Sequence, residues 1–152
     1  MRRKDREKDS DFALNVTDQC PYAVLSMITP DGMPYCIPLS IVRDGGNIYF
    51  HSAKEGFKTD CLRAAPDVCL CCAANVISAE DKFTTGFDSA VIRGRASEVI
   101  EKDEKIHALE LIARKYTPQL IEKLPEALER SLERTAIWKI SIDSITGKQK
   151  KL

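Results

Sequence analysis

The sequence lacks an excess of charge of either sign, because 23 lysines and arginines balance 23 aspartates and glutamates. A protein that binds nucleic acid mainly by neutralising phosphates needs a basic surplus, so we exclude a dedicated nucleic-acid binder. The chain also lacks any apolar run approaching the roughly 20 residues of a membrane span. No apolar segment follows the charged start MRRKDREKD, so a secretory signal is not indicated. We therefore expect a cytoplasmic protein with no membrane-embedded part.

Residues that build metal sites are also scarce. The chain has only two histidines, and its six cysteines contain a single C-x₂-C spacing, Cys69–Cys72, with no second pair to complete a four-ligand site. Structural zinc sites need such paired ligands, so we predict no metal site. Thiols stay reduced in the cytosol, which argues against a disulfide framework. Cys69, Cys71 and Cys72 lie in an apolar segment and are interpreted as small hydrophobic strand residues.

With 152 residues, the chain is long enough to enclose one core, and we predict a single domain over residues 1–152. Residues 1–10 carry mixed charges and predict a flexible arm, followed by a short helix over Asp11–Gln19. Strand patterns then occur in six segments: Tyr22–Thr29, Tyr35–Val42, Ile48–Phe50, Val68–Val76, Ala90–Ile100 and Thr135–Ile142. Before the last strand, residues 102–133 show helical spacing interrupted by two prolines and predict a helical insertion.

The short connections between the early strands indicate an antiparallel sheet, because parallel neighbours need long crossovers. Closing such a sheet into a barrel removes its edges. The predicted fold class is mainly β (α+β), a small antiparallel six-stranded β-barrel with peripheral helices. Pro38 marks an edge or a bulge, and Gly94 suggests a bulge or a close backbone approach. The nearly continuous apolar run Val68–Val76 predicts a strand buried on both faces.

The stretch NIYFHSAKEGFKTDCLRAA, residues 47–65, differs most from a generic globular pattern. A strand through Ile48–Phe50 leads into a polar turn, and a helix starts near Gly56 and stops before Pro66. Free backbone N–H groups at the start of a helix attract anions, and Lys54 and Lys58 add positive charge beside them. The pattern predicts an anion site, with a cofactor phosphate as the working hypothesis.

Two single residues could have a role at this site. His51 lies at the strand end beside Ser52; a lone histidine is more often structural than catalytic, but its position next to the predicted anion site favours a role. Trp138 lies on the last strand, where a tryptophan by default belongs to the core. At a dimer interface it could instead pack on a cofactor ring.

Residues 49–58, Tyr-Phe-His-Ser-Ala-Lys-Glu-Gly-Phe-Lys, resemble the signature of the flavin-binding split-barrel superfamily that includes pyridoxamine 5′-phosphate oxidase. Further stretches resemble its nitroimidazole-resistance reductase branch: the N-terminal MRRKDRE, Pro34–Ser40, Ser89–Ala96 and Trp138–Lys148. The resemblance covers essentially the whole chain, and the His-Ser-Ala-x-x-Gly-x-Lys block is its most specific part.

The resemblance implies a split-barrel homodimer with FMN at the subunit interface. Ile37, Pro38, Leu39 and Ser40 would line the isoalloxazine ring, His51, Ser52 and Ala53 would follow the cofactor toward its phosphate, and Lys58 would contact that phosphate. The partner subunit would bring Ser89, Ala90, Val91 and Ile92, with Trp138 or Lys148, to the same flavin. The residue matching His51 is the favoured group on the substrate side, which makes His51 the candidate catalytic residue.

The function implied by the resemblance is an FMN-dependent oxidoreductase that reduces small nitroaromatic or quinone-like acceptors. Vitamin B6 oxidation is less favoured, because Phe57 stands where those oxidases usually carry an arginine and their C-terminal arginine-rich motif is missing. Two alternatives stay open. One is a flavin-binding protein that stores or senses FMN without turnover; the other is a haem-binding or haem-degrading relative with His51 as axial ligand.

Overall fold

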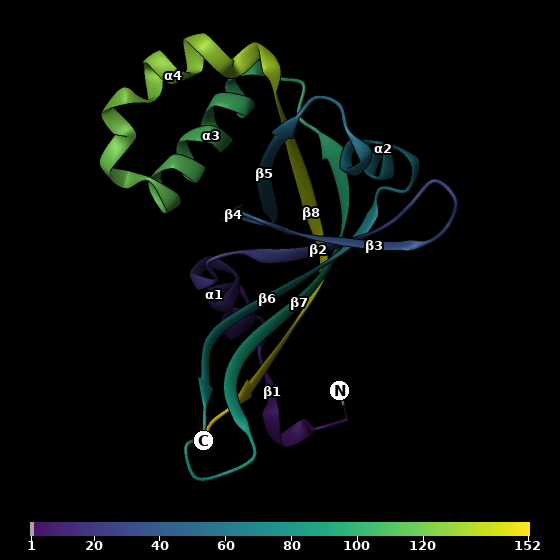
Figure 1. The fold of residues 1–152 in the computed structure, drawn as a ribbon, viewed down its shortest axis with the longest axis vertical. Helices are drawn as coiled ribbons and strands as arrows, with labels where there is room; N and C mark the ends of the chain where they lie inside the picture. Colours follow the sequence, from purple (N-terminus) through teal and green to yellow (C-terminus); the bar gives the residue numbers. More distant parts are fainter. Residues whose placement is uncertain (1) are drawn as a thin grey trace.

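One strongly curved antiparallel sheet organises the chain in the computed structural model, which describes residues 2–152 (Figure 1). Its strands are β1 (Glu7–Lys8), β2 (Ala23–Ile28), β3 (Pro34–Leu39), β4 (Val42–Asp44), β5 (Asn47–Ala53), β6 (Asp67–Ser78), β7 (Thr85–Glu98) and β8 (Thr135–Lys150). The helices are α1 (Ser10–Gln19), α2 (Phe57–Ala64), α3 (Lys102–Tyr116) and α4 (Leu124–Ser131). Short 3-10 turns occur at Lys4–Arg6, Pro118–Lys123 and Leu132–Arg134.

The strand order is β3-β2-β6-β7-β8-β5-β4, with β1 beside β8 and every pairing antiparallel. The predicted mainly β class is confirmed, and the six predicted strands correspond to the six longer ones. The two additional strands, β1 and β4, have two and three residues, too few for a side-chain pattern to show. The order ends at β3 on one side and β4 on the other. These two strands follow each other in the chain but are not paired with each other. The curved sheet is therefore a barrel that stays open between them, a split barrel.

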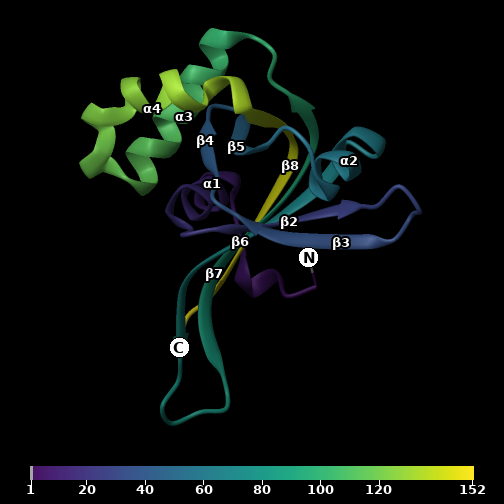
Figure 2. The same cartoon turned by 45° about the horizontal axis from the view of Figure 1, so that its top comes forward.

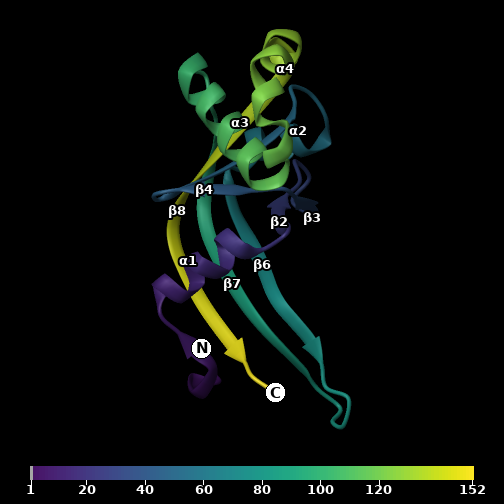
Figure 3. The ribbon, with the colours of Figure 1, turned by 90° about the vertical axis from the view of Figure 1, so that its left-hand side faces the viewer.

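The helices lie around this sheet at separate places. Helix α1 packs along the middle of β6, β7 and β8, and α3 lies against β4 and β5. Figure 2 shows α3 and α4 at one side of the barrel and α2 at the other, near β2 and β3. Below the barrel, β6, β7 and β8 continue side by side as a long twisted extension that ends near the C-terminus (Figure 3). The molecule therefore has a barrel end and an extended end.

The inward residues of the strands form the core. Leu25, Leu70 and Ile92 are consecutive cross-strand neighbours on β2, β6 and β7, and all three are completely buried. The prediction that Val68–Val76 is buried on both faces is wrong. Its residues alternate, with Val68, Leu70 and Cys72 inside and Cys71 and Ala73 outside. The outer face carries small side chains of low polarity, which is why the segment looked uniformly apolar.

Two irregular positions follow the predictions. Pro38 lies in β3, a strand at one end of the sheet order, where a proline is tolerated because the strand pairs on one side only. The register between β7 and β8 shifts at Arg93 and Gly94. At Gly94, a side-chain Cβ would overlap the carbonyl oxygen of Ser141 and lie 2.8 Å from Ile140 Cγ2. Gly94 therefore combines both expected features, a bulge and a close backbone approach.

The ends of the chain are more regular than their sequences suggest. The predicted flexible arm contains Met1, which lies outside the described residues, but Lys4–Arg6 form a turn and Glu7–Lys8 pair with Lys148 and Gly147. The last strand runs to Lys150 rather than stopping at Ile142. Its second half pairs with β7, a long-range interaction that its polar local sequence does not reveal.

The region between β7 and β8 is helical from Lys102 to Arg134, apart from Thr117. Pro125 falls in the first turn of α4, where a proline is tolerated because its missing N–H would have no helical partner. Within residues 2–152, none of the helices is both long and apolar enough to cross a membrane.

Replacing Gly94 with alanine should destabilise the protein by about 1–3 kcal/mol, because the new methyl group forces β7 and β8 apart. Urea unfolding followed by circular dichroism measures the change. Gly46→Ala is the matched control, since nothing lies within 4 Å of a Cβ at that position. Equal stability of the two variants would contradict the close approach at Gly94.

Candidate functional site

The start of α2 offers backbone N–H groups that no side chain caps among the described residues. Gly56 precedes the helix with a φ of 137°, a conformation that favours glycine, and its carbonyl accepts the hydrogen bond from Asp60 N at 3.1 Å. The N–H groups of Phe57, Lys58 and Thr59 lie before this first helical bond and have no acceptor within the helix. Together with the helix dipole, this arrangement suits an anion.

Lys58 brings a positive charge to this helix start. Its side chain is half-buried, its Nζ atom lies 5.6 Å from the centre of the Phe50 ring, and desolvation lowers its pKa. Within residues 2–152 its ammonium group has neither a hydrogen bond nor an ion pair. An unpaired, partly desolvated ammonium group is costly, so a phosphate group fits the donors present here. Lys54 in contrast is exposed to solvent.

His51 lies one residue from Phe50 on β5 and pairs across the sheet with Ile137 on β8. Part of its ring is open to solvent, but the surrounding chain desolvates it. This desolvation, followed by the charge of Lys58, lowers the pKa of His51. Its ring has no hydrogen-bond partner among residues 2–152. A neutral, unpartnered imidazole can both donate and accept a hydrogen bond.

Tyr116, at the end of α3, fixes the break between β3 and β4. Its hydroxyl donates to the Ile41 carbonyl at 2.8 Å and accepts from the Ile41 N–H at 2.9 Å. Burial raises the pKa of Tyr116, so the phenol stays protonated and keeps both bonds. No local signal in the sequence distinguishes Tyr116 from the other residues of the helical segment 102–133.

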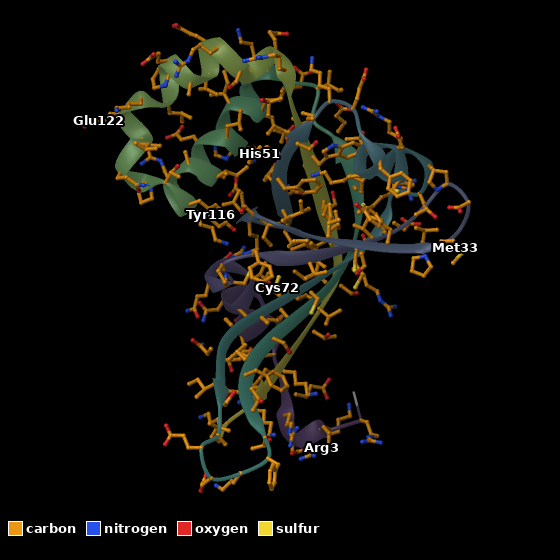
Figure 4. All side chains as sticks on the ribbon, in the orientation of Figure 1. Arg3, Met33, His51, Cys72, Tyr116 and Glu122 are labelled. Atoms are coloured by element: carbon orange, nitrogen blue, oxygen red, sulfur yellow. The ribbon has the colours of Figure 1, made fainter. Side chains whose placement is uncertain are left out.

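Ser40 and His51 line one cavity of about 420 Å³ beneath α3 and α4. Figure 4 shows His51 and Tyr116 on the side of the barrel that these helices cover. The structure therefore brings together two site residues that the sequence predicts from separate segments. They are Ser40, which precedes β4, and His51 on β5.

The remaining residues of this predicted group lie on β3 and around the turn after β5. Ile37 and Leu39 are half-buried and pack against the core, while Pro38 faces outward. Tyr35 and Phe57 meet edge to face with ring centres 5.1 Å apart, which joins β3 to the start of α2. Ser52 and Ala53 end β5, and the Ser52 hydroxyl donates to the Ala53 carbonyl at 2.7 Å.

A second group of predicted residues lies elsewhere, on the β7–β8 ladder. Ser89 pairs with Lys148, and Ala90 with Gly147. Ala90 and Ile92 are buried in their own core, whereas Val91 is 40% exposed on the outer face. The C-terminal end of β8, which carries Lys148, lies in the extended part of the sheet, away from α2 (Figure 1). Within one chain these residues are not brought to Lys58 and His51.

Trp138 is placed in the core, which is the default interpretation of a strand tryptophan. It is 2% exposed and pairs with Phe50 on one side and Glu98 on the other. Its indole N–H is buried with no hydrogen-bond partner among the described residues. The side chain is enclosed by its own chain, so nothing in this geometry supports contact with a partner's cofactor.

The pKa of His51 should lie below its ordinary value of about 6.5, and Lys58→Met should raise it by removing a nearby positive charge. The increase should be partial, because desolvation is the larger cause and persists in the variant. The chain has only two histidines, so a proton NMR titration of the imidazole signals resolves them. Lys54→Met is the control with an exposed lysine. A wild-type value above 6.5 would contradict the described environment.

Comparison with known proteins supports the fold at this point. The family model described as pyridoxamine 5′-phosphate oxidase matches residues 10–149. No curated protein matches the sequence. A solved structure from Bacteroides thetaiotaomicron, assigned to 5-nitroimidazole antibiotic resistance, superposes with a TM-score of 0.77 at 24% identity, covering 93% of this chain and 84% of that one.

Two further structures share the fold. The flavocytochrome Anf3 of Azotobacter vinelandii has a TM-score of 0.83 at 23% identity over 100% of this chain and 72% of its own. The FAD and haem binding protein of Mycobacterium smegmatis has a TM-score of 0.79 at 21% identity, with 97% and 74% covered. The family model spans nearly the whole chain and confirms the predicted resemblance: this protein belongs to the pyridoxamine 5′-phosphate oxidase family.

Proposed function

We propose that this protein is an FMN-dependent oxidoreductase that reduces small nitroaromatic or quinone-like acceptors and works as a homodimer. The observation that carries the proposal is the half-buried Lys58, unpaired within residues 2–152, at the uncapped start of α2. The family assignment supports a flavin, and two relatives of the same fold are described as a flavocytochrome and as an FAD and haem binding protein.

The cofactor's phosphate would be held by Lys58 and the first N–H groups of α2. One lysine and one helix start match a single terminal phosphate, which favours FMN over a dinucleotide. The ring would lie along the backbone of Ile37–Ser40 and the end of β5 at His51–Ala53. When bound, the flavin supplies hydride and electron transfer, and the protein orients it and excludes water.

His51 is the proposed catalytic residue because its neutral ring has no partner within residues 2–152 and lines the cavity beside Ser40. A neutral imidazole can donate a hydrogen bond to an acceptor's oxygen and so stabilise the negative charge that develops there. The lowered pKa of His51 keeps most rings neutral at pH 7, so the site does not add a second cation beside Lys58.

The outer face of the sheet supports a second copy as partner. Val24, Cys71 and Val91 are consecutive cross-strand neighbours there, and both Cys71 and Val91 are exposed. Burying this apolar row against the same row of a second chain suits a two-fold interface. Such a dimer would place Ser89–Ile92 and Lys148 of one chain near the Lys58 site of the other.

The purified protein should be yellow, contain one FMN per chain and sediment as a dimer. Its reduced flavin should be reoxidised by a small nitroaromatic compound, which absorbance follows directly. Bound FMN that no donor and acceptor can cycle would instead support storage or sensing, and a Soret band would support haem binding. A stable monomer with stoichiometric FMN would contradict the shared site.

Lys58→Ala should weaken FMN binding by about 1.5–3 kcal/mol, the scale of one hydrogen bond to a charged group. Titration of the apoprotein with FMN, followed by flavin fluorescence, measures the affinity. Lys54→Ala removes an equal charge four residues away and should bind FMN like the wild type. If both variants bind equally well, Lys58 is not a phosphate ligand.

A further inference from the structure

The helical insertion between β7 and β8 covers one side of the cavity beside His51. The floor of the cavity is formed by Ser40, His51 and Thr135, and its walls come from α3 and α4. The wall residues are Leu109, Ile112, Ala113, Tyr116, Thr117, Leu124, Ala127, Leu128 and Ser131. Its volume of about 420 Å³ falls within the range of small-molecule sites.

Helix α4 directs its apolar face to this cavity. Leu124, Ala127 and Leu128 follow helical spacing, so they share one side of α4. None of the residues of α4 is buried, although this side is apolar, and these three remain half-buried. Although α4 contacts α3, its apolar face is only partly covered and lines the cavity, which leaves hydrophobic surface available to a ligand.

The cavity lining carries no lysine, arginine, aspartate or glutamate. Three of its hydroxyl groups already donate to backbone carbonyls: Ser131 to Ala127 at 2.7 Å, Thr135 to Ser131 at 2.9 Å and Thr117 to Ala113 at 3.3 Å. Tyr116 is fixed to Ile41. His51 and Ser40 remain as the polar side chains of the lining for which the described chain shows no hydrogen bond.

We infer that this cavity binds an uncharged, largely apolar aromatic molecule whose single polar group faces His51, and that Leu124, Ala127 and Leu128 determine which molecules enter. A charged group in the cavity would lose its hydration without meeting an opposite charge. Phosphorylated or carboxylated substrates are therefore rejected. The inference rests on the proposed function only in treating His51 as the group that meets the acceptor.

Nitronaphthalene and its sulfonated analogue test this selectivity, because they differ by one negative charge. Binding to the oxidised full-length protein, measured by equilibrium dialysis without reductant, requires no turnover. The sulfonated compound should bind at least about tenfold more weakly than nitronaphthalene, since the cavity offers its charge no partner. Equal or tighter binding of the sulfonated compound would overturn the inference.

Leu128→Trp should weaken nitronaphthalene binding about tenfold or more by filling the cavity. Glu129→Trp adds the same side chain at an exposed position of α4 and should bind like the wild type. Ala127→Phe enters the cavity from the same face and should repeat the effect of Leu128→Trp, which guards against a folding defect in one variant. Unchanged binding in both cavity variants would overturn the inference.

Flavin content is measured in the same samples, which separates this inference from the proposed function. Leu128→Trp and Glu129→Trp should retain the wild-type flavin content, and loss of flavin from Leu128→Trp alone would assign the cavity to the cofactor and overturn the inference. If wild-type protein contains no flavin but shows the expected selectivity for nitronaphthalene, the proposed function fails while the cavity assignment holds.

Discussion

The rest of the structure depends on the antiparallel ladder between β7 and β8. It runs from the pair Glu98–Trp138 in the barrel to the pair Phe87–Lys150 in the extension, with one irregularity at Gly94. Because the same two strands belong to both ends of the molecule, the ladder sets how far Lys148 lies from the α2 site. The bulge at Gly94 leaves Asp143 without a partner on β7 and lets the same two strands serve both the barrel and the extension, with the pairing resuming on either side.

The sequence predicts most of the barrel because strand alternation is a local property. Buried Leu25, Leu70 and Ile92 each stand in such a pattern. Local patterns fail where pairing is decided at long range: the second half of β8 is polar and becomes a strand only because β7 lies beside it. They also fail on β6, since Cys71 and Ala73 are small enough to look buried while facing outward.

The candidate site also has one part that the local sequence predicts and another that depends on long-range packing. The strand, turn and helix start around Lys58 follow from neighbouring residues, and the sequence predicts them together with His51. The cavity depends on Tyr116 and Leu128, which lie far from His51 in the chain and look like ordinary apolar helix positions. Only the packing of α3 and α4 over β5 gives them a place in the site. Trp138 is enclosed for a similar reason, because residues on both neighbouring strands surround it.

The double hydrogen bond between Tyr116 and Ile41 divides the helical insertion into two parts with different freedom to change. The end of α3 is anchored to the backbone beside the proposed flavin, so substitutions there would disturb the cofactor and the fold together. Helix α4 begins after this anchor and buries none of its residues. Relatives could therefore acquire new substrates through α4 alone, with the anchored half preserving the chemistry that every variant needs.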